Sequence, residues 1–101
     1  MLLHQIIKKS VQATAGSYSN NTDKLLSGIL MHILVQAVND DTTFDFSIVN
    51  SKGITIKEYL RQTGEIEDEV YLPIKDVNTY SITNSSVTGE TYNIILSIDE
   101  S

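Results

Sequence analysis

The chain has 101 residues, of which 7 are Lys or Arg and 13 are Asp or Glu, so its formal net charge at pH 7 is −6. A chain of this charge is repelled by phosphate backbones, and we expect no nucleic-acid partner. The absence of cysteine excludes disulfides, thiol nucleophiles and thiolate metal sites. At this length, residues 1–101 are expected to form a single domain.

The first segment, residues 2–11, mixes apolar and polar side chains and is predicted to form a strand. Leu3, Ile7 and Val11 fall on one face of that strand, and Leu2 and Ile6 fall on the other. Polar residues interrupt the apolar ones too often for a secretory signal, so we expect synthesis in the cytoplasm. Residues 14–23 are rich in residues that favour turns, and we predict a surface loop there.

Residues 23–38 fit two periodicities. Apolar residues at positions 25, 26, 29, 30, 33, 34, 37 and 38 match one face of a helix, which Thr22 or Asp23 could cap. Gly28 and several β-branched residues favour a strand, and we predict a strand over 28–38 because the rest of the chain is β. A helix over 23–38, in an α+β fold, is the alternative. The segment is too short and too polar to cross a bilayer, and we expect no membrane partner.

The stretch TTFDFSIVNSKGITI, residues 42–56, carries the clearest pattern in the chain. Phe44, Phe46 and Ile48 fall on one face of a half-buried strand, and the turn-forming residues 50–53 follow it, which predicts a β-hairpin. Further strands are predicted over residues 54–60, 70–74, 80–82 and 91–99, with Pro73 indicating a sheet edge. The sequence therefore predicts an all-β fold of about seven antiparallel strands, in a sandwich or a small jelly-roll-like barrel.

Residue types that carry catalysis or bind cofactors are sparse. The two histidines, His4 and His32, lie outside any recognisable nucleophile motif. Acidic groups at positions 40–45 and 65–69 do not match a calcium-binding loop, and the five glycines lie at separate turns. We therefore predict that the protein is not an enzyme and uses no cofactor, metal or small-molecule substrate.

Several apolar side chains fall on strand faces that would normally meet water. In the predicted strand 28–38, Ile29, Met31, Ile33, Val35 and Ala37 share one face, while the opposite face is also apolar. Contiguous apolar patches on proteins often mark contact sites, and tyrosines are common in such surfaces. We predict burial against copies of the same chain or against a partner protein. The interface candidates are Leu2, Ile6, Leu30, His32, Leu34, Tyr59, Tyr71 and Ile95.

The stretch TTFDFSIVNSKGITI, followed by VYLPIKDVNTYSITNSSVTGETYNIILSI, resembles small single-sandwich structural proteins in the virions of tailed bacteriophages. The resemblance covers most of the chain from Leu25 onward, and the Tyr-Ser-Ile and Tyr-Asn-Ile-Ile-Leu patterns also resemble accessory domains of secreted bacterial enzymes. The phage resemblance implies a protein that coats, cements or adapts a capsid or tail, is made in the host cytoplasm and contacts other virion proteins. The second resemblance implies a module that binds carbohydrates or surfaces.

Overall fold

The computed structural model of the protein describes residues 3–100, with the side chains of Leu3, His4 and Leu26 excepted. Leu2, one of the interface candidates, lies outside the described residues. Within them the chain forms eight strands and one turn of 3-10 helix. In chain order these are β1 (Leu3–Ala13), the 3-10 turn η1 (Thr14–Gly16), β2 (Tyr18–Asn21), β3 (Leu25–Ala37), β4 (Thr43–Val49), β5 (Thr55–Thr63), β6 (Glu65–Asp76), β7 (Thr79–Thr83) and β8 (Glu90–Glu100).

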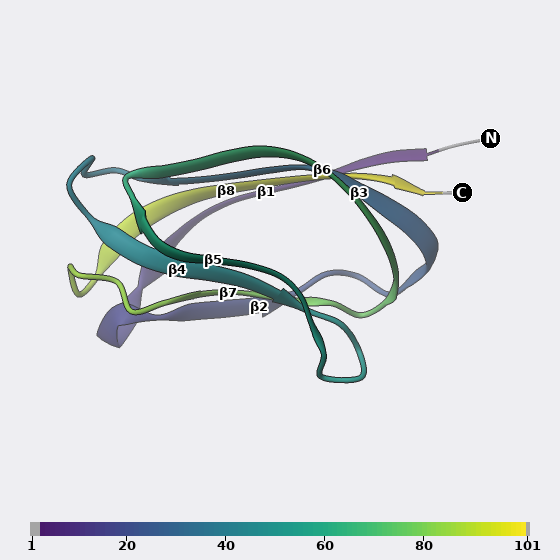
Figure 1. Ribbon diagram of the computed structural model, residues 1–101, viewed down its shortest axis with the longest axis horizontal. Coiled ribbons are helices and arrows are strands. Elements are labelled where there is room, and N and C mark those ends of the chain that lie inside the picture. The colour runs from purple at the N-terminus through teal and green to yellow at the C-terminus, as the bar shows by residue number, and fades with distance from the viewer. Residues whose placement is uncertain (1–2, 101) are drawn as a thin grey trace.

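The strands form two four-stranded antiparallel sheets that lie one above the other (Figure 1). One sheet has the order β1-β8-β3-β6, and we call it sheet A; the other has the order β2-β7-β4-β5, and we call it sheet B. Strands β4 and β5 form a hairpin within sheet B, whereas every other connection crosses between the sheets. This wrapped order is that of an eight-stranded jelly roll, which confirms the predicted all-β class. Within residues 3–100, no helix has the length and hydropathy needed to cross a bilayer.

The segment predicted as a surface loop over residues 14–23 contains a strand, β2, which is one of the eight strands within residues 3–100. Strand β2 pairs with β7 along its whole length, from Tyr18 opposite Ile82 to Asn21 opposite Thr79. Tyr18 packs against the core. The loop prediction was wrong because it rested on the local preference of these residues for turns, whereas backbone hydrogen bonds to β7 hold the segment in an extended conformation.

Residues 25–37 form strand β3, which confirms the strand prediction and excludes the helix. Between Leu30 and His32 this strand advances by two residues, while β8 advances by one, from Ile98 to Ser97. The extra residue, Met31, is a β-bulge, and a one-residue insertion moves every later side chain to the opposite face.

The bulge corrects the predicted faces of β3. Beyond it Ile33, Val35 and Ala37 point into the core, as predicted, but before it the inward residue is Leu30, which is 1% exposed. Leu30 was predicted to lie on an outer face as an interface residue, and this placement is wrong. Its side chain belongs to the core and is unavailable to a partner.

The other predicted strands are confirmed, and their inward faces form one core between the sheets. Phe44, Phe46 and Ile48 of β4 are buried, and the β4–β5 turn follows at residues 50–53. Tyr92 of β8 packs edge-on against Phe44, with ring centroids 5.0 Å apart. Pro73 lies on β6, an edge strand of sheet A, as predicted. The buried apolar residues therefore occupy the inner face of each sheet, and each sheet has one outer face that does not take part in the core.

Candidate protein-interaction surface

The central row of the outer face of sheet B is polar, although Leu60 on the edge strand β5 is 56% exposed. Across it the antiparallel registers align Ser19 of β2 with Ser81 of β7, and Ser81 with Ser47 of β4. The Ser19 and Ser81 hydroxyls are hydrogen-bonded at 3.0 Å, and the Thr79 hydroxyl of β7 donates to Asn21 Oδ1 at 2.8 Å. Side chains of this face thus hydrogen-bond to one another, and a polar outer face is normal for an antiparallel sheet.

The outer face of sheet A is different, because its two central strands carry apolar side chains outward. Ile95 of β8 and Leu34 of β3 are half-buried neighbours in register. Leu34 points outward because it follows the bulge, and Ile95 because it alternates with the buried Ile94 and Leu96. From β1 to β6 the central row of this face reads Lys8, Ile95, Leu34 and Glu67. The matching row of sheet B reads Ser19, Ser81, Ser47 and Glu58.

Further apolar groups extend this patch. Ile6, on β1, is 57% exposed, and Tyr71, on the outer side of β6, is 68% exposed. His32 is half-buried beside Ser97 in register. We call the outward side chains of Ile6, His32, Leu34, Tyr71 and Ile95 the apolar face. It contains five of the eight predicted interface residues, so the structure brings most of them onto one surface.

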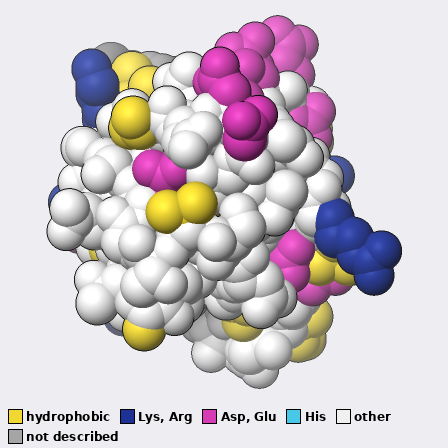
Figure 2. Space-filling model, turned by 90° about the vertical axis from the view of Figure 1, so that its left-hand side faces the viewer, with side chains coloured by type: hydrophobic (Ala, Val, Ile, Leu, Met, Phe, Trp, Pro, Cys, Tyr) yellow, Lys and Arg dark blue, Asp and Glu magenta, His cyan; other side chains and the backbone are white. Residues whose placement is uncertain are grey.

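Charge is graded across the apolar face. Lys8 points outward from β1, one edge strand of sheet A, whereas Lys9 lies opposite the buried Ile94 and alternates to the other side. Glu65, Glu67 and Glu69 lie on β6, the other edge strand, which also carries Lys75 near its end. Figure 2 views the molecule end-on with sheet A uppermost, and along its upper rim basic and hydrophobic groups gather on the left while acidic groups gather on the right. The apolar side chains of the central strands β8 and β3 thus lie between Lys8 on one edge strand and the glutamates on the other.

The surface over the central row is a shallow hollow of about 590 Å³. Leu34 and Ile95 line it, and Lys8, Gln36 and Asn93 are among its polar boundaries. An apolar depression with a polar rim is the usual anatomy of a protein contact site.

Tyr59, another predicted contact residue, is partly buried and packs against the core. Its ring lies 6.5 Å from that of Phe46, and its hydroxyl donates to Asp68 Oδ2 at 2.6 Å. Burial, together with this hydrogen bond, raises the pKa of the Tyr59 hydroxyl well above its usual range. Tyr59 and Tyr71 therefore lie on different sheets, one pointing inward and the other outward, and do not form a common aromatic platform.

The acidic residues do not assemble into a metal centre. Among the side chains that the structure describes, no three from His, Cys, Asp or Glu are grouped closely enough to hold a metal ion. Asp45 accepts the backbone N–H of Arg61 and the side-chain N–H of Asn84, each at 2.8 Å. These two donors, the Arg61 N–H first, hold the pKa of Asp45 below its usual value. Asp45 thus tethers strand β5 to the residue that follows β7.

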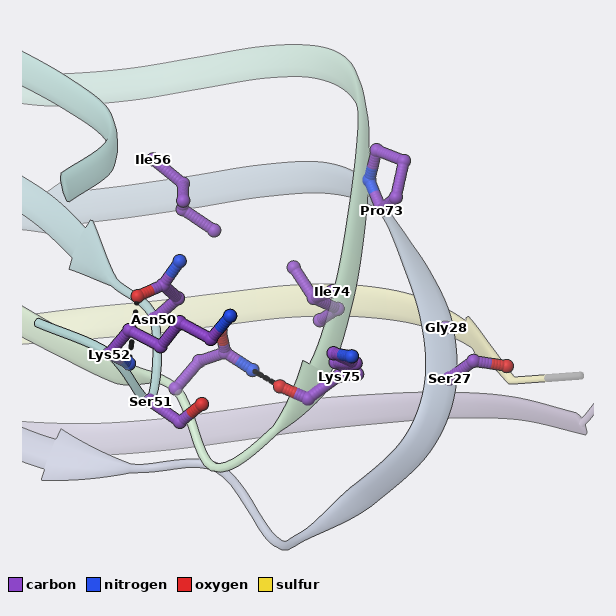
Figure 3. Close-up of a pocket in the computed structure, with 10 residues that line it drawn as sticks. Ser27, Gly28, Asn50, Ser51, Lys52, Ile56, Pro73, Ile74 and Lys75 are labelled. Atoms are coloured by element: carbon purple, nitrogen blue, oxygen red, sulfur yellow. Dashed lines mark hydrogen bonds between the residues drawn. The ribbon is translucent and has the colours of Figure 1, made fainter. Parts of the chain in front are cut away.

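A second hollow, of about 370 Å³, opens beside the β4–β5 turn (Figure 3). Ile56 and Ile74 give it an apolar wall, while Lys52 and Lys75 lie nearer solvent. Asn50 Oδ1 accepts the backbone N–H of Lys52 at 3.0 Å and fixes the turn. This hollow is not predictable from the sequence, because its lining comes from β3, β5, β6 and the β4–β5 turn, which are far apart in the chain.

No protein-family model matches the chain, and no curated protein sequence matches it. Among solved structures, a structure of the infectious bursal disease virus Gx strain is 13% identical, with a TM-score of 0.43 over 99% of this chain and 33% of the other. A mutant VP2 protein of that virus, from T=1 particles, is 12% identical, with a TM-score of 0.45 over 98% and 32%. Latent PorU from Porphyromonas gingivalis is 9% identical, with a TM-score of 0.43 over 98% and 13%. The chain spans about a third of the length of the virus chains and less of PorU.

Proposed function

We propose that this chain is a non-enzymatic structural protein of a tailed-phage virion, which coats, cements or adapts part of the capsid or tail through protein contacts. The single observation that carries the proposal is the contrast between its two outer sheet faces. Where sheet B presents a row of serines, sheet A presents Ile95 and Leu34 at matching central positions.

Leaving this face in water is unfavourable. Burying a fully exposed leucine or isoleucine side chain contributes about 1.5–3 kcal/mol. Ile6 is more than half exposed, and Leu34 and Ile95 retain part of their surface, so together they offer several kcal/mol toward association. Association must overcome the loss of translational and side-chain freedom, and a contiguous patch does so better than scattered residues.

The kind of partner follows from the chemistry of the patch. The net charge of −6 argues against nucleic acid, and the graded charges flanking an apolar centre suit another folded protein. The phage assignment is supported by the sequence resemblance, which rests on residues 42–56 and 70–98 and covers most of the chain from Leu25 onward. The separation of Tyr59 from Tyr71 removes the aromatic platform on which the carbohydrate-binding alternative depended.

The test is a quantitative mass-spectrometric inventory of purified phage particles from the source of this chain. We expect the chain in many copies per particle, and we expect the Leu34→Lys variant to be lost from particles. Ser47→Lys is the matched control, because it also lies on a central strand with a glutamate, Glu58, opposite it in register. Thermal melts establish that both variants fold. Absence of the chain from particles, or incorporation of folded Leu34→Lys at the wild-type level, would refute the proposal.

A further inference from the structure

We infer that the apolar face binds a second copy of this chain, face to face, about a twofold axis that runs along the strands between β8 and β3. The inference rests on the proposed function and names the partner of its interface. The evidence for this axis is the order of charged side chains across the strands of sheet A.

Two in-plane twofold axes bring the apolar face onto its own copy with the strands of the two copies aligned, which is the common way for sheets to pack. An axis perpendicular to the strands places β1 over β1 of the other chain, so that Lys8 meets Lys8 and the glutamates of β6 meet glutamates. An axis parallel to the strands places β1 over β6, because it exchanges the two edges of the sheet. Only the parallel axis is favourable, since the two edges carry opposite charge.

The parallel axis also keeps each cross-strand row in register with itself. The central row of Lys8, Ile95, Leu34 and Glu67 then meets the same row reversed. Lys8 faces Glu67 of the second copy twice, once at each edge, and Ile95 faces Leu34 at the centre. Charges at the rim and aliphatic groups at the centre are the arrangement of a stable protein interface.

The size of the face is adequate. Four strands spaced about 4.8 Å apart, with about 3.3 Å per residue along strands of 11 residues, cover roughly 700 Å². A stable interface of standard size buries about 800 Å² on each partner. Because the standard value is slightly larger than the flat area of the face, a dimer through it uses the whole face, which requires full overlap of the two sheets about the central axis.

The test is sedimentation velocity of the full chain at micromolar concentration and low salt, with Lys8→Glu, Glu67→Lys and their equimolar mixture. Each single variant places like charges at both edges of its own homodimer, so we expect its dissociation constant to rise about tenfold. The mixture restores opposite charges at both edges of a heterodimer, because one chain carries glutamate at both positions and the other carries lysine. We expect the mixture to regain the wild-type affinity.

The controls reverse charges away from the apolar face. Glu58→Lys changes the edge strand β5 of sheet B, and Lys52→Glu changes the β4–β5 turn; both are expected to dimerise like the wild type. A wild-type chain that stays monomeric at about 100 μM, a concentration far above the dissociation constant of a stable interface, overturns the second-copy inference. If that monomer still enters particles, the proposed function stands with another protein as partner. A dimer whose single variants dissociate like the wild type, or whose mixture stays as weak as the single variants, overturns the axis.

Discussion

Gly64 holds the turn between β5 and β6 against the loop that joins β3 and β4. Its backbone φ is +74°, in the left-handed region, and a Cβ placed there would lie 2.7 Å from the carbonyl oxygen of Asp40. The Gly64 N–H donates to the Thr42 carbonyl and its carbonyl accepts the Ala37 N–H, both at 2.8 Å. A side chain at this position must therefore push away the Asp40 carbonyl or shift the Gly64 backbone, which is hydrogen-bonded through both its N–H and its carbonyl.

The magnitude for Gly64→Ala has two parts. A non-glycine residue in the left-handed region costs about 1–2 kcal/mol. Forcing a methyl group into a filled site costs about a further 1–3 kcal/mol. Gly89 separates the two contributions, because its φ is +78° but a Cβ there meets nothing within 4 Å. Gly89→Ala should therefore show the conformational cost alone.

Urea unfolding at equilibrium measures the difference. We expect Gly64→Ala to lose about 1–3 kcal/mol more than Gly89→Ala, with little change in the slope against urea. In a thermal melt this extra loss is about 4–8 °C for each kcal/mol in a domain of this size. If the two variants agree to within about 0.5 kcal/mol, the Asp40 carbonyl does not constrain the turn and the argument fails.

Two more predictions concern buried or tethered polar groups. Because the pKa of Asp45 in the folded protein lies below its ordinary value of 3.8, its contribution to stability is present above that value and is lost as the pH falls through the folded pKa. We expect acid to lower the unfolding free energy of the wild type more steeply than that of Asp45→Asn. Equal dependence of the two unfolding free energies on acid pH would contradict this. Tyr59→Phe removes the hydroxyl that donates to Asp68 and should cost about 1–3 kcal/mol in urea unfolding. Tyr71→Phe, on an exposed side chain, should change stability little, and equal losses in the two variants would refute the assigned role of Tyr59.

Local alternation determined much of the fold. The period of two in residues 44–48 and 92–98 predicted which side chains face the core, because burial on one side of a strand leaves a direct imprint on composition. The β4–β5 turn was equally local, since residues 50–53 carry their own turn chemistry. The sequence also predicted that some apolar side chains lie outside the core, and Ile6, Leu34 and Ile95 do.

Pairing between distant strands decided the rest. The bulge at Met31 depends on the register of β3 against β8, which no local pattern encodes, and it moved Leu30 from the predicted outer face into the core. Strand β2 exists because β7 lies beside it. The row that joins Lys8, through two aliphatic residues, to Glu67 is spread over four strands, so its charge order appears only once the sheet is assembled. The sequence of a strand specifies which of its faces is apolar, whereas the residues that lie beside it on adjacent strands are set by hydrogen bonding between distant segments.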